Sequence, residues 1–262
     1  MGTSLSKAPV YFVAAQIRHN PIDALVLDAA LLARIKDALR KLGFSDQAQI
    51  DNALRIEQVG ANVEFPQPKQ FLFKNRDSTE AVCISLDRNL YQTTAYSDFE
   101  QFKSNFLNAL AKIHQIAELD YVDAVSMRML DAIVPTDGKD LQDYLPNELL
   151  GLTTWADERS WQIIHQSIER AFDSNENRIV LRCIRRPAEM AFPPNFLPVG
   201  MKLRPEFATL NTRHAVLDTD AAFSARFRFD LNEIESHLLS IKNDLSQCFK
   251  NIVTPQALEE WK

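Results

Sequence analysis

Glycine is scarce in this chain, with only six among 262 residues. Turns that bind dinucleotides or phosphates need glycines at fixed spacings, so that the backbone can approach the phosphate oxygens closely. The sequence contains no GxGxxG motif and no P-loop, and it also lacks the GxSxG turn that presents a catalytic serine. These absences argue against a glycine-rich nucleotide site and against a hydrolase of the nucleophile-elbow type.

Cysteine is rarer still, and the three cysteines lie far apart at Cys83, Cys183 and Cys248. No CxxC pair exists, so neither a zinc knuckle nor a disulfide framework is expected. We interpret all three as small buried hydrophobes of a cytoplasmic protein kept in a reducing environment. The five histidines show no HxH, HxxxH or HExxH spacing, and no cofactor is predicted.

An excess of positive charge is also missing. The chain has 29 Lys and Arg against 35 Asp and Glu, which gives a net charge of -6. Broad electrostatic binding to nucleic acid or to an anionic membrane needs the opposite balance. No apolar run approaches the 18 residues of a membrane-spanning helix. We therefore predict no membrane association and rate nucleic acid as the least favoured partner, although a local basic patch stays compatible with this composition.

Hydrophobic periodicity predicts a mixed α+β chain. Strands are expected at residues 9–19, 52–59, 69–75, 80–86, 90–96 and 121–133, where apolar side chains alternate or run together. On the first strand, a period of two places Tyr11 with Val13 on one face and Phe12 on the other. Helical stripes are expected at 28–42, at 98–117 after Asp98, and at 231–250 after Asp230, with a short helix near 144–151.

The two halves of the chain share a pattern. The segments that start at Ala81 and Ala215 each contain a strand beginning Ala-Val, a turn near an aspartate, a second strand and an Asp-capped helix. Such internal similarity predicts a repeated structural unit. Equivalence of the halves assigns 159–172 to a strand, whereas Trp161, Ile164, Ile168 and Phe172 also form a helical stripe; we favour the strand.

We therefore predict two tandem β-α-β4-α repeats, residues 1–118 and 119–262, that join into one curved antiparallel sheet of about ten strands. Four helices would cover one face and leave the other concave and partly open to water. This is the strand and helix order of the TATA-binding-protein-like saddle. The likeness concerns architecture alone, because a fold does not imply a function.

Several stretches also resemble one protein family. The opening PVYFVAAQIRHNPI, the central SMRMLDAI, the late HAVLDTD and the C-terminal FxxIVTPxxLxxW are similar to a sporadically distributed bacterial family of about this length. The matching positions are Gln16, Arg18, Asn20, Pro21, Arg128, Leu217, Asp218, Asp220, Phe249, Thr254 and Trp261. The chain departs from the family pattern at Asp131, usually Asn, and at His19, usually an aromatic. The resemblance implies a bacterial, cytosolic protein of unknown activity.

Arginines in apolar strands are the first candidate site. A guanidinium binds a carboxylate or a phosphate in a fork, so arginines gathered on the concave face could hold an acidic peptide, a phosphate-bearing ligand or a nucleic acid backbone. Alternatively, they lie on the solvated side and pair with nearby Asp and Glu. Arg185 and Arg186 crowd one of these strands. The candidate binding residues are Gln16, Arg18, Asn20, Arg128, Arg182, Arg226 and Arg228.

Asp218 and Asp220 form a second candidate site. They are two residues apart on a predicted strand, so their side chains point to one face. Together with Asp131 or His214 they could supply oxygen and nitrogen ligands to Mg²⁺ or Ca²⁺. Strand carboxylates also commonly cap turns or pair with arginine, and that alternative stays open.

A proline-rich segment at 187–207 is the third candidate. It holds five prolines together with Met190, Phe192 and Phe196. A loop this long within a compact domain is often a binding loop, and an apolar one suits a protein partner or a second copy of the chain. It could equally pack on its own sheet and cover an edge.

These observations favour a binding or regulatory module without catalytic activity, with a protein partner or a homo-oligomer. The scattered distribution implied by the family resemblance suggests an accessory role in a bacterial defence or mobile locus. The alternative hypothesis is a metal-dependent enzyme that acts on a phosphate or carboxylate substrate through Asp218, Asp220 and the sheet arginines. On that hypothesis a divalent metal raises the melting temperature and Asp218→Asn abolishes the rise; the absence of any rise would exclude it.

Overall fold

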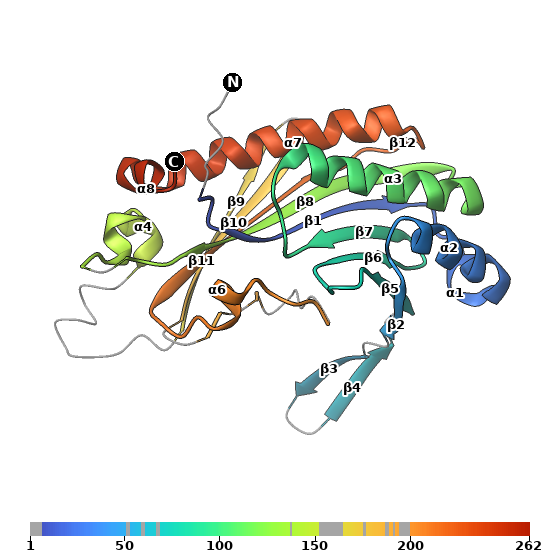
Figure 1. The fold of residues 1–262 in the computed structure, drawn as a ribbon, viewed down its shortest axis with the longest axis horizontal. Coiled ribbons are helices and arrows are strands. Elements are labelled where there is room, and N and C mark those ends of the chain that lie inside the picture. Colours follow the sequence, from blue (N-terminus) through green and yellow to red (C-terminus); the bar gives the residue numbers. More distant parts are fainter. Residues whose placement is uncertain are drawn as a thin grey trace.

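The computed structural model shows an α+β protein built on one large antiparallel sheet (Figure 1). Its main sheet has ten strands, and helices α2, α3 and α7 lie along one face. The structure describes residues 7–50, 53–58, 61–66, 69–136, 138–151, 165–174, 177–186, 189–190, 192–193 and 200–262. Within these residues, no helix combines the length and the apolar character needed to cross a membrane.

The first half of the chain begins with a strand and ends with a helix. Its elements, in chain order, are β1 (Val10–His19), α1 (Ala24–Leu27), α2 (Ala29–Lys41), β2 (Asp46–Ile50), β3 (Ala53–Gln58), β4 (Ala61–Pro66), β5 (Gln70–Lys74), β6 (Glu80–Ile84), β7 (Arg88–Thr93) and α3 (Phe99–Ala117).

The second half also begins with a strand and ends in helices. Its elements are β8 (Tyr121–Ile133), a 3₁₀ turn η1 (Leu141–Asp143), α4 (Asn147–Leu150), β9 (Gln166–Asp173), β10 (Asn177–Arg186), α6 (Pro205–Ala208), β11 (His214–Phe223), β12 (Phe227–Arg228), α7 (Leu231–Ile252) and α8 (Pro255–Glu260).

The strand order of the main sheet is β2-β5-β6-β7-β1-β8-β11-β10-β9, with β12 paired to β8 as an additional strand. Strands β1 and β8 therefore meet in the middle, where the first half of the chain joins the second. Their register pairs Ala14 with Arg128 and Gln16 with Ser126. All pairs are antiparallel, and β2 and β9 form the two edges.

The helices follow from local sequence. The Asp98 side chain caps α3 by accepting a hydrogen bond of 2.9 Å from the backbone N–H of Gln101, and Asp230 caps α7 in the same way. The predicted stripe of α3 is buried, from Phe99 to Ile113. Each large apolar side chain taken out of water stabilises the fold by about 1.5–3 kcal/mol. This burial fixes the helices on one face of the sheet.

Two strand predictions need correction, and a third is confirmed over the part that the structure describes. The predicted 52–59 strand is β3, which pairs only with β4 in a separate hairpin, while β2 at Asp46–Ile50 supplies the edge of the main sheet instead. The predicted 90–96 strand runs from Arg88 to Thr93. Of the predicted 159–172 strand, the structure describes β9 from Gln166, and residues 159–164 lie outside the described residues.

The predicted orientation of Tyr11 is wrong. A register shift between Val10 and Phe12, where β1 pairs with β8, adds a residue to the strand. Because of this bulge, Tyr11 packs in the same cluster as Phe12 and Ala14, whereas Val13, Ala15 and Ile17 face the helices. Both tyrosine and phenylalanine therefore lie on the face opposite the helices.

That opposite face, here called the open face, is not open along its whole length. Helix α6 lies across one end of it (Figure 1), and Met190 and Phe192 pack against the same cluster of buried residues on this face. The Lys202 backbone accepts a hydrogen bond of 2.5 Å from the Thr94 hydroxyl, and the Arg204 guanidinium donates to the Val10 carbonyl at 2.7 Å. The prediction that this whole face is uncovered is therefore wrong at this end. The other end, where Arg18 and Arg88 are exposed, is called the uncovered end below.

Candidate functional site

The open face carries a charged cluster at its centre. Asp218 on β11 is fully buried and accepts two hydrogen bonds from Arg128 on β8, from Nε at 2.7 Å and from Nη2 at 2.6 Å. The Arg182 Nη1 group on β10 lies 3.2 Å from the same carboxylate, and Arg182 also bonds Glu169 on β9. Four strands thus contribute to one chain of alternating charges.

This cluster brings together residues that the sequence placed in different sites. The sequence predicts Arg128 and Arg182 as candidate ligand-binding residues and Asp218 as a candidate metal ligand. In the structure, both oxygens of Asp218 accept hydrogen bonds from guanidinium groups. An ion pair with this fork geometry positions the side chains and neutralises the buried carboxylate. Asp218 therefore pairs with arginine, which is the alternative to metal binding that the sequence left open.

Asp220 lies one row further along β11, opposite Arg128 in the register. Its side chain is partly exposed on the open face. Burial raises the pKa of Asp220, while Arg128 and Arg182 oppose that rise and Asp218 adds to it. Asp218 and Asp220 therefore share one face, as their spacing predicts.

The other two expected metal ligands do not join them. Asp131 pairs in register with Val10 and Leu217, which belong to the core on the helix side, so its carboxyl points away from the open face. His214 is buried at the far end of β11, with its ring Nδ1 2.8 Å from the Thr212 carbonyl. Among the described residues, no three His, Cys, Asp or Glu side chains are grouped to hold a metal ion.

The uncovered end of the open face has a different character. Here Arg18 on β1 and Arg88 on β7 lie directly opposite each other in the register, and both are exposed. Side chains in such a position have Cβ atoms about 5 Å apart, and a like-charged pair there is destabilising. Arg88 has Asp87 at 3.6 Å, whereas Arg18 has no ion-pair partner among the residues that the structure describes.

Small and polar side chains form the floor beside these arginines. Ala124 lies opposite Arg18, and the next row contains Gln16, Ser126 and Ala222 from three adjacent strands. All four are partly exposed. The row ends at Arg178 on β10, beside Asp173 on β9. Because strands are spaced about 4.8 Å apart, this floor is about 15 Å wide from Gln16 to Arg178.

Arg226 belongs to the same end of the face, and Arg228 is exposed near it. Arg226 Nε donates to Asp123 at 2.8 Å, and its guanidinium lies 4.0 Å from the ring centre of Tyr121. The hydrogen bond from Arg226 lowers the pKa of Asp123, and the positive charge of Arg18 lowers it further. Arg228 pairs in register with Tyr121.

Asn20 has a structural position. Its side-chain oxygen accepts hydrogen bonds from the backbone N–H of Asp120 at 3.0 Å and of Tyr121 at 3.5 Å, and its amide donates to the Asp120 carboxylate at 3.3 Å. These bonds tie the end of β1 to the connection between α3 and β8. Asn20 therefore fixes the joint between the two halves, and it is not directed at the floor described above.

The proline-rich segment packs on its own sheet where it is described. The Phe192 ring centre lies 5.6 Å from those of Tyr11 and Phe12, and Met190 contacts the same cluster. Met190 and Phe192 therefore cover the protein's own sheet, which is one of the two alternatives that the sequence left open for this segment. Phe196 lies outside the described residues.

Sequence reasoning missed Arg88 and Arg178 as members of this surface. Arg88 follows an aspartate in a turn, and nothing local distinguishes it from a solvated turn residue. Conversely, Arg185 was grouped with Arg182, but it is buried on the helix side and donates to the Leu150 carbonyl at 2.8 Å. Comparison with protein-family models and with curated proteins finds no match for this chain.

Proposed function

We propose that this protein is a non-catalytic binding module whose uncovered sheet end holds an acidic segment of a partner protein. The direct opposition of Arg18 and Arg88 supports this proposal most strongly. Two exposed guanidinium groups that repel each other are both stabilised when a carboxylate lies between them. In a chain with an overall charge of -6, these two arginines form a local positive region that attracts an anionic segment.

The floor of the site favours an extended peptide segment. Ala124, Ser126 and Ala222 are small enough to let a backbone approach, and Gln16 can donate or accept hydrogen bonds there. Arg178 at the other end of the row could hold a second acidic side chain. A peptide with carboxylates spaced about 15 Å apart would contact both ends of the row.

We further propose that the sheet is assembled from two tandem β-α-β4-α repeats in a TATA-binding-protein-like saddle. Counted from the middle outward, β1-β7-β6-β5 and β8-β11-β10-β9 follow the same order, which supports it. The outer strand β2 in the first half and β12 beside β8 in the second half have no counterpart in the other half. Residues 1–118 and 119–262 would be the two repeats, and the shared centre would be the pairing of β1 with β8. An accessory role in a bacterial locus remains part of this proposal.

The test measures binding of a fluorescent peptide of about ten residues that alternates Glu with Ser and Ala. Arg18→Glu and Arg88→Glu should each weaken its binding at least about tenfold, because each replaces an attraction by a repulsion. Arg170→Glu is the matched control: Arg170 is exposed on β9, and its register partner Leu181 lies in the helix-side core.

Equal binding to the wild type and to both variants would overturn the proposed site, as would an equal loss with Arg170→Glu. A single-stranded oligonucleotide that binds more tightly than the peptide, with a steep salt dependence, would favour a nucleic acid partner instead. For the enzyme alternative, Mg²⁺ should raise the melting temperature, and Asp218→Asn should remove that rise.

A further inference from the structure

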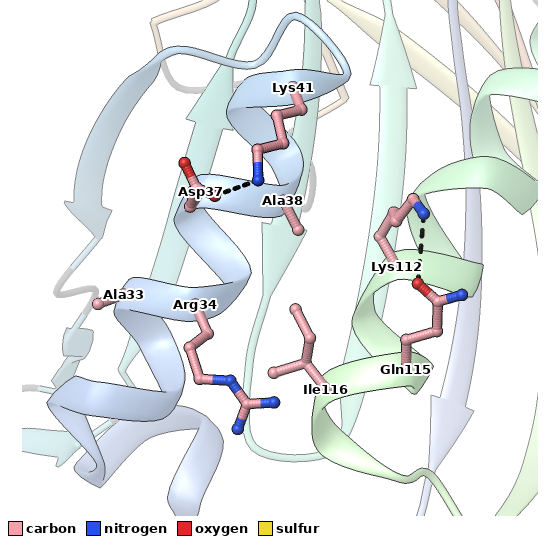
Figure 2. Close-up of a pocket in the computed structure, with 8 residues that line it drawn as sticks. All are labelled: Ala33, Arg34, Asp37, Ala38, Lys41, Lys112, Gln115 and Ile116. Carbon is pink, nitrogen blue, oxygen red and sulfur yellow. Dashed lines mark hydrogen bonds and ion pairs between the residues drawn. The ribbon is translucent and has the colours of Figure 1, made fainter.

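A groove on the helix side of the protein lies between α2 and α3, away from the open face (Figure 2). Its lining includes Ala38 from α2 and Ile116 from α3, which point into the space between the two helices. Figure 2 shows Ile116 and Arg34 pointing into the space between the two helices. The lined stretch of α2, from Ala33 to Lys41, is about 12 Å long, or two helical turns.

Three cations line this groove against a single carboxylate. Lys41 bonds Asp37 at 2.6 Å, and the same Asp37 also accepts a hydrogen bond from Arg40 at 2.8 Å. Lys112 on α3 has only the neutral Gln115 as a hydrogen-bond partner, at 3.3 Å, and Arg34 has no ion-pair partner among the described residues. The groove therefore carries net positive charge in an acidic protein.

The neighbouring helix junction shows what this groove lacks. Between α3 and α7, Lys103 bonds Glu235 at 2.7 Å across the junction and Glu100 at 2.8 Å within α3, and its side chain is only 15% exposed. Across the groove between α2 and α3, the described residues form no such ion pair. Arg34 and Lys112 instead come from opposite sides with the same charge.

We infer that this groove is a docking site for an acidic amphipathic helix of a partner protein. The small Ala38 side chain lets a third helix pack closely by ridges-into-grooves contacts, and the apolar side chains of that helix would lie over Ala38 and Ile116. Carboxylates on its flanks would neutralise Arg34 and Lys112. The inference concerns a surface other than the one proposed above and does not depend on it.

The test uses two helical peptides of about 18 residues that share a leucine face and differ only in having Glu or Lys on both flanks. Fluorescence anisotropy measures their binding to the full chain. The Glu peptide should bind the wild type, and the double variant Arg34→Glu, Lys112→Glu should weaken it at least about tenfold. The variant Lys36→Glu, Lys250→Glu changes two exposed lysines outside the groove and should leave the affinity unchanged.

Three results would overturn the inference: no binding of the Glu peptide, equal binding of the Lys peptide, or undiminished binding by the groove variant. The inference would also be overturned if sedimentation showed that the wild type is a dimer and that the groove variant is a monomer, because the groove would then bind a second copy of this chain. Arg18→Glu, Arg88→Glu should leave binding of the helical peptide intact, so the two surfaces are tested separately.

Discussion

At the scale of single residues, the buried pair of Arg128 and Asp218 is the most consequential feature. Asp218 is fully buried, and Arg128 is 9% exposed. Removing charges from water costs free energy that the fork geometry and the second arginine, Arg182, offset. We therefore expect the pair to fix the geometry of the sheet centre more than it adds to the stability of the fold.

Because the cost of burying the charges is offset only while both partners are present, removing one partner should destabilise the protein more than removing both. Arg128→Met should lower the free energy of unfolding by about 3–5 kcal/mol, because it leaves a buried carboxylate with less compensation. The double variant Arg128→Met, Asp218→Leu should recover most of that loss, since no uncompensated charge remains. Urea unfolding followed by circular dichroism measures both.

The matched control is Arg170→Met, which removes an exposed arginine and should change the unfolding free energy by less than about 0.5 kcal/mol. If the double variant were as unstable as Arg128→Met, the interpretation of the pair as a compensated buried charge would be wrong.

Asp131 is the second residue with a clear physical consequence. Its carboxyl is 5% exposed, and no hydrogen bond to it is found among the described residues. Burial raises the pKa of Asp131 to about 7. The folded state therefore holds a proton that the unfolded chain releases near pH 4.

The sign of the pH dependence follows from that order. The protonated Asp131 carboxyl makes its full contribution to the free energy of unfolding below about pH 4. This contribution is lost as the pH rises through 7, and the loss reaches about 4 kcal/mol. Asp131→Asn should remove this loss. The variant should be more stable than the wild type at pH 8 and about equally stable at pH 4.

Thermal unfolding at a series of pH values measures the difference between Asp131→Asn and the wild type. Asp23→Asn, at an exposed position on the approach to α1, should show no such pH-dependent gain. A gain of equal size for Asp131→Asn at pH 4 and pH 8 would contradict the assignment of the effect to a buried proton.

At the scale of elements, local sequence signals located α2, α3, α4, α7 and most strands, whereas α1, α6 and α8 were not predicted. The stripe after Asp98 became α3, and the stripe after Asp230 became α7, because capping and apolar periodicity act over a few residues. The strand predicted at 121–133 matches β8 residue for residue. These elements are strongly periodic and need little tertiary information.

For other strands, pairing with a neighbouring strand determined which face a side chain occupies and which sheet the strand joins. The period of two placed Tyr11 on the wrong face, because a bulge depends on pairing with β8, more than 100 residues away in the sequence. Likewise, nothing within residues 52–59 indicates that β3 pairs with β4 alone while β2 joins the main sheet. Register is a property of two strands, so one strand's alternation cannot supply it.

At the scale of the whole molecule, the two ends of the described chain lie close together. The backbone N–H of Lys7 donates to the Trp261 carbonyl at 3.0 Å. The two halves meet in the pairing of β1 with β8, and the connection between α3 and β8 is short. If the halves are equivalent units, the covalent order in which they follow each other should matter little.

We therefore expect a circular permutant that begins at Leu119 and joins Lys262 to Lys7 through a flexible linker to fold. It should unfold in one cooperative transition with a far-ultraviolet circular dichroism spectrum like that of the parent. A permutant opened within β8, between Met127 and Arg128, is the control and should fail to fold because it interrupts the central strand.

The expected result would support the tandem organisation, whereas a permutant opened at Leu119 that does not fold would contradict it. If the folded permutant also binds the acidic peptide, the open face keeps its structure when the covalent order of the two halves is changed.

The sequence by itself determined the α+β class, the Asp-capped helices, the long central strand and the shared face of Asp218 and Asp220, because each depends on residues within a few positions of one another. Only the tertiary structure decided that Asp218 pairs with Arg128, that Asp131 lies on the other face, and that Arg18 opposes Arg88. Those contacts join residues 70 to 90 positions apart or depend on register, and packing the strands into one sheet is what brings the side chains together.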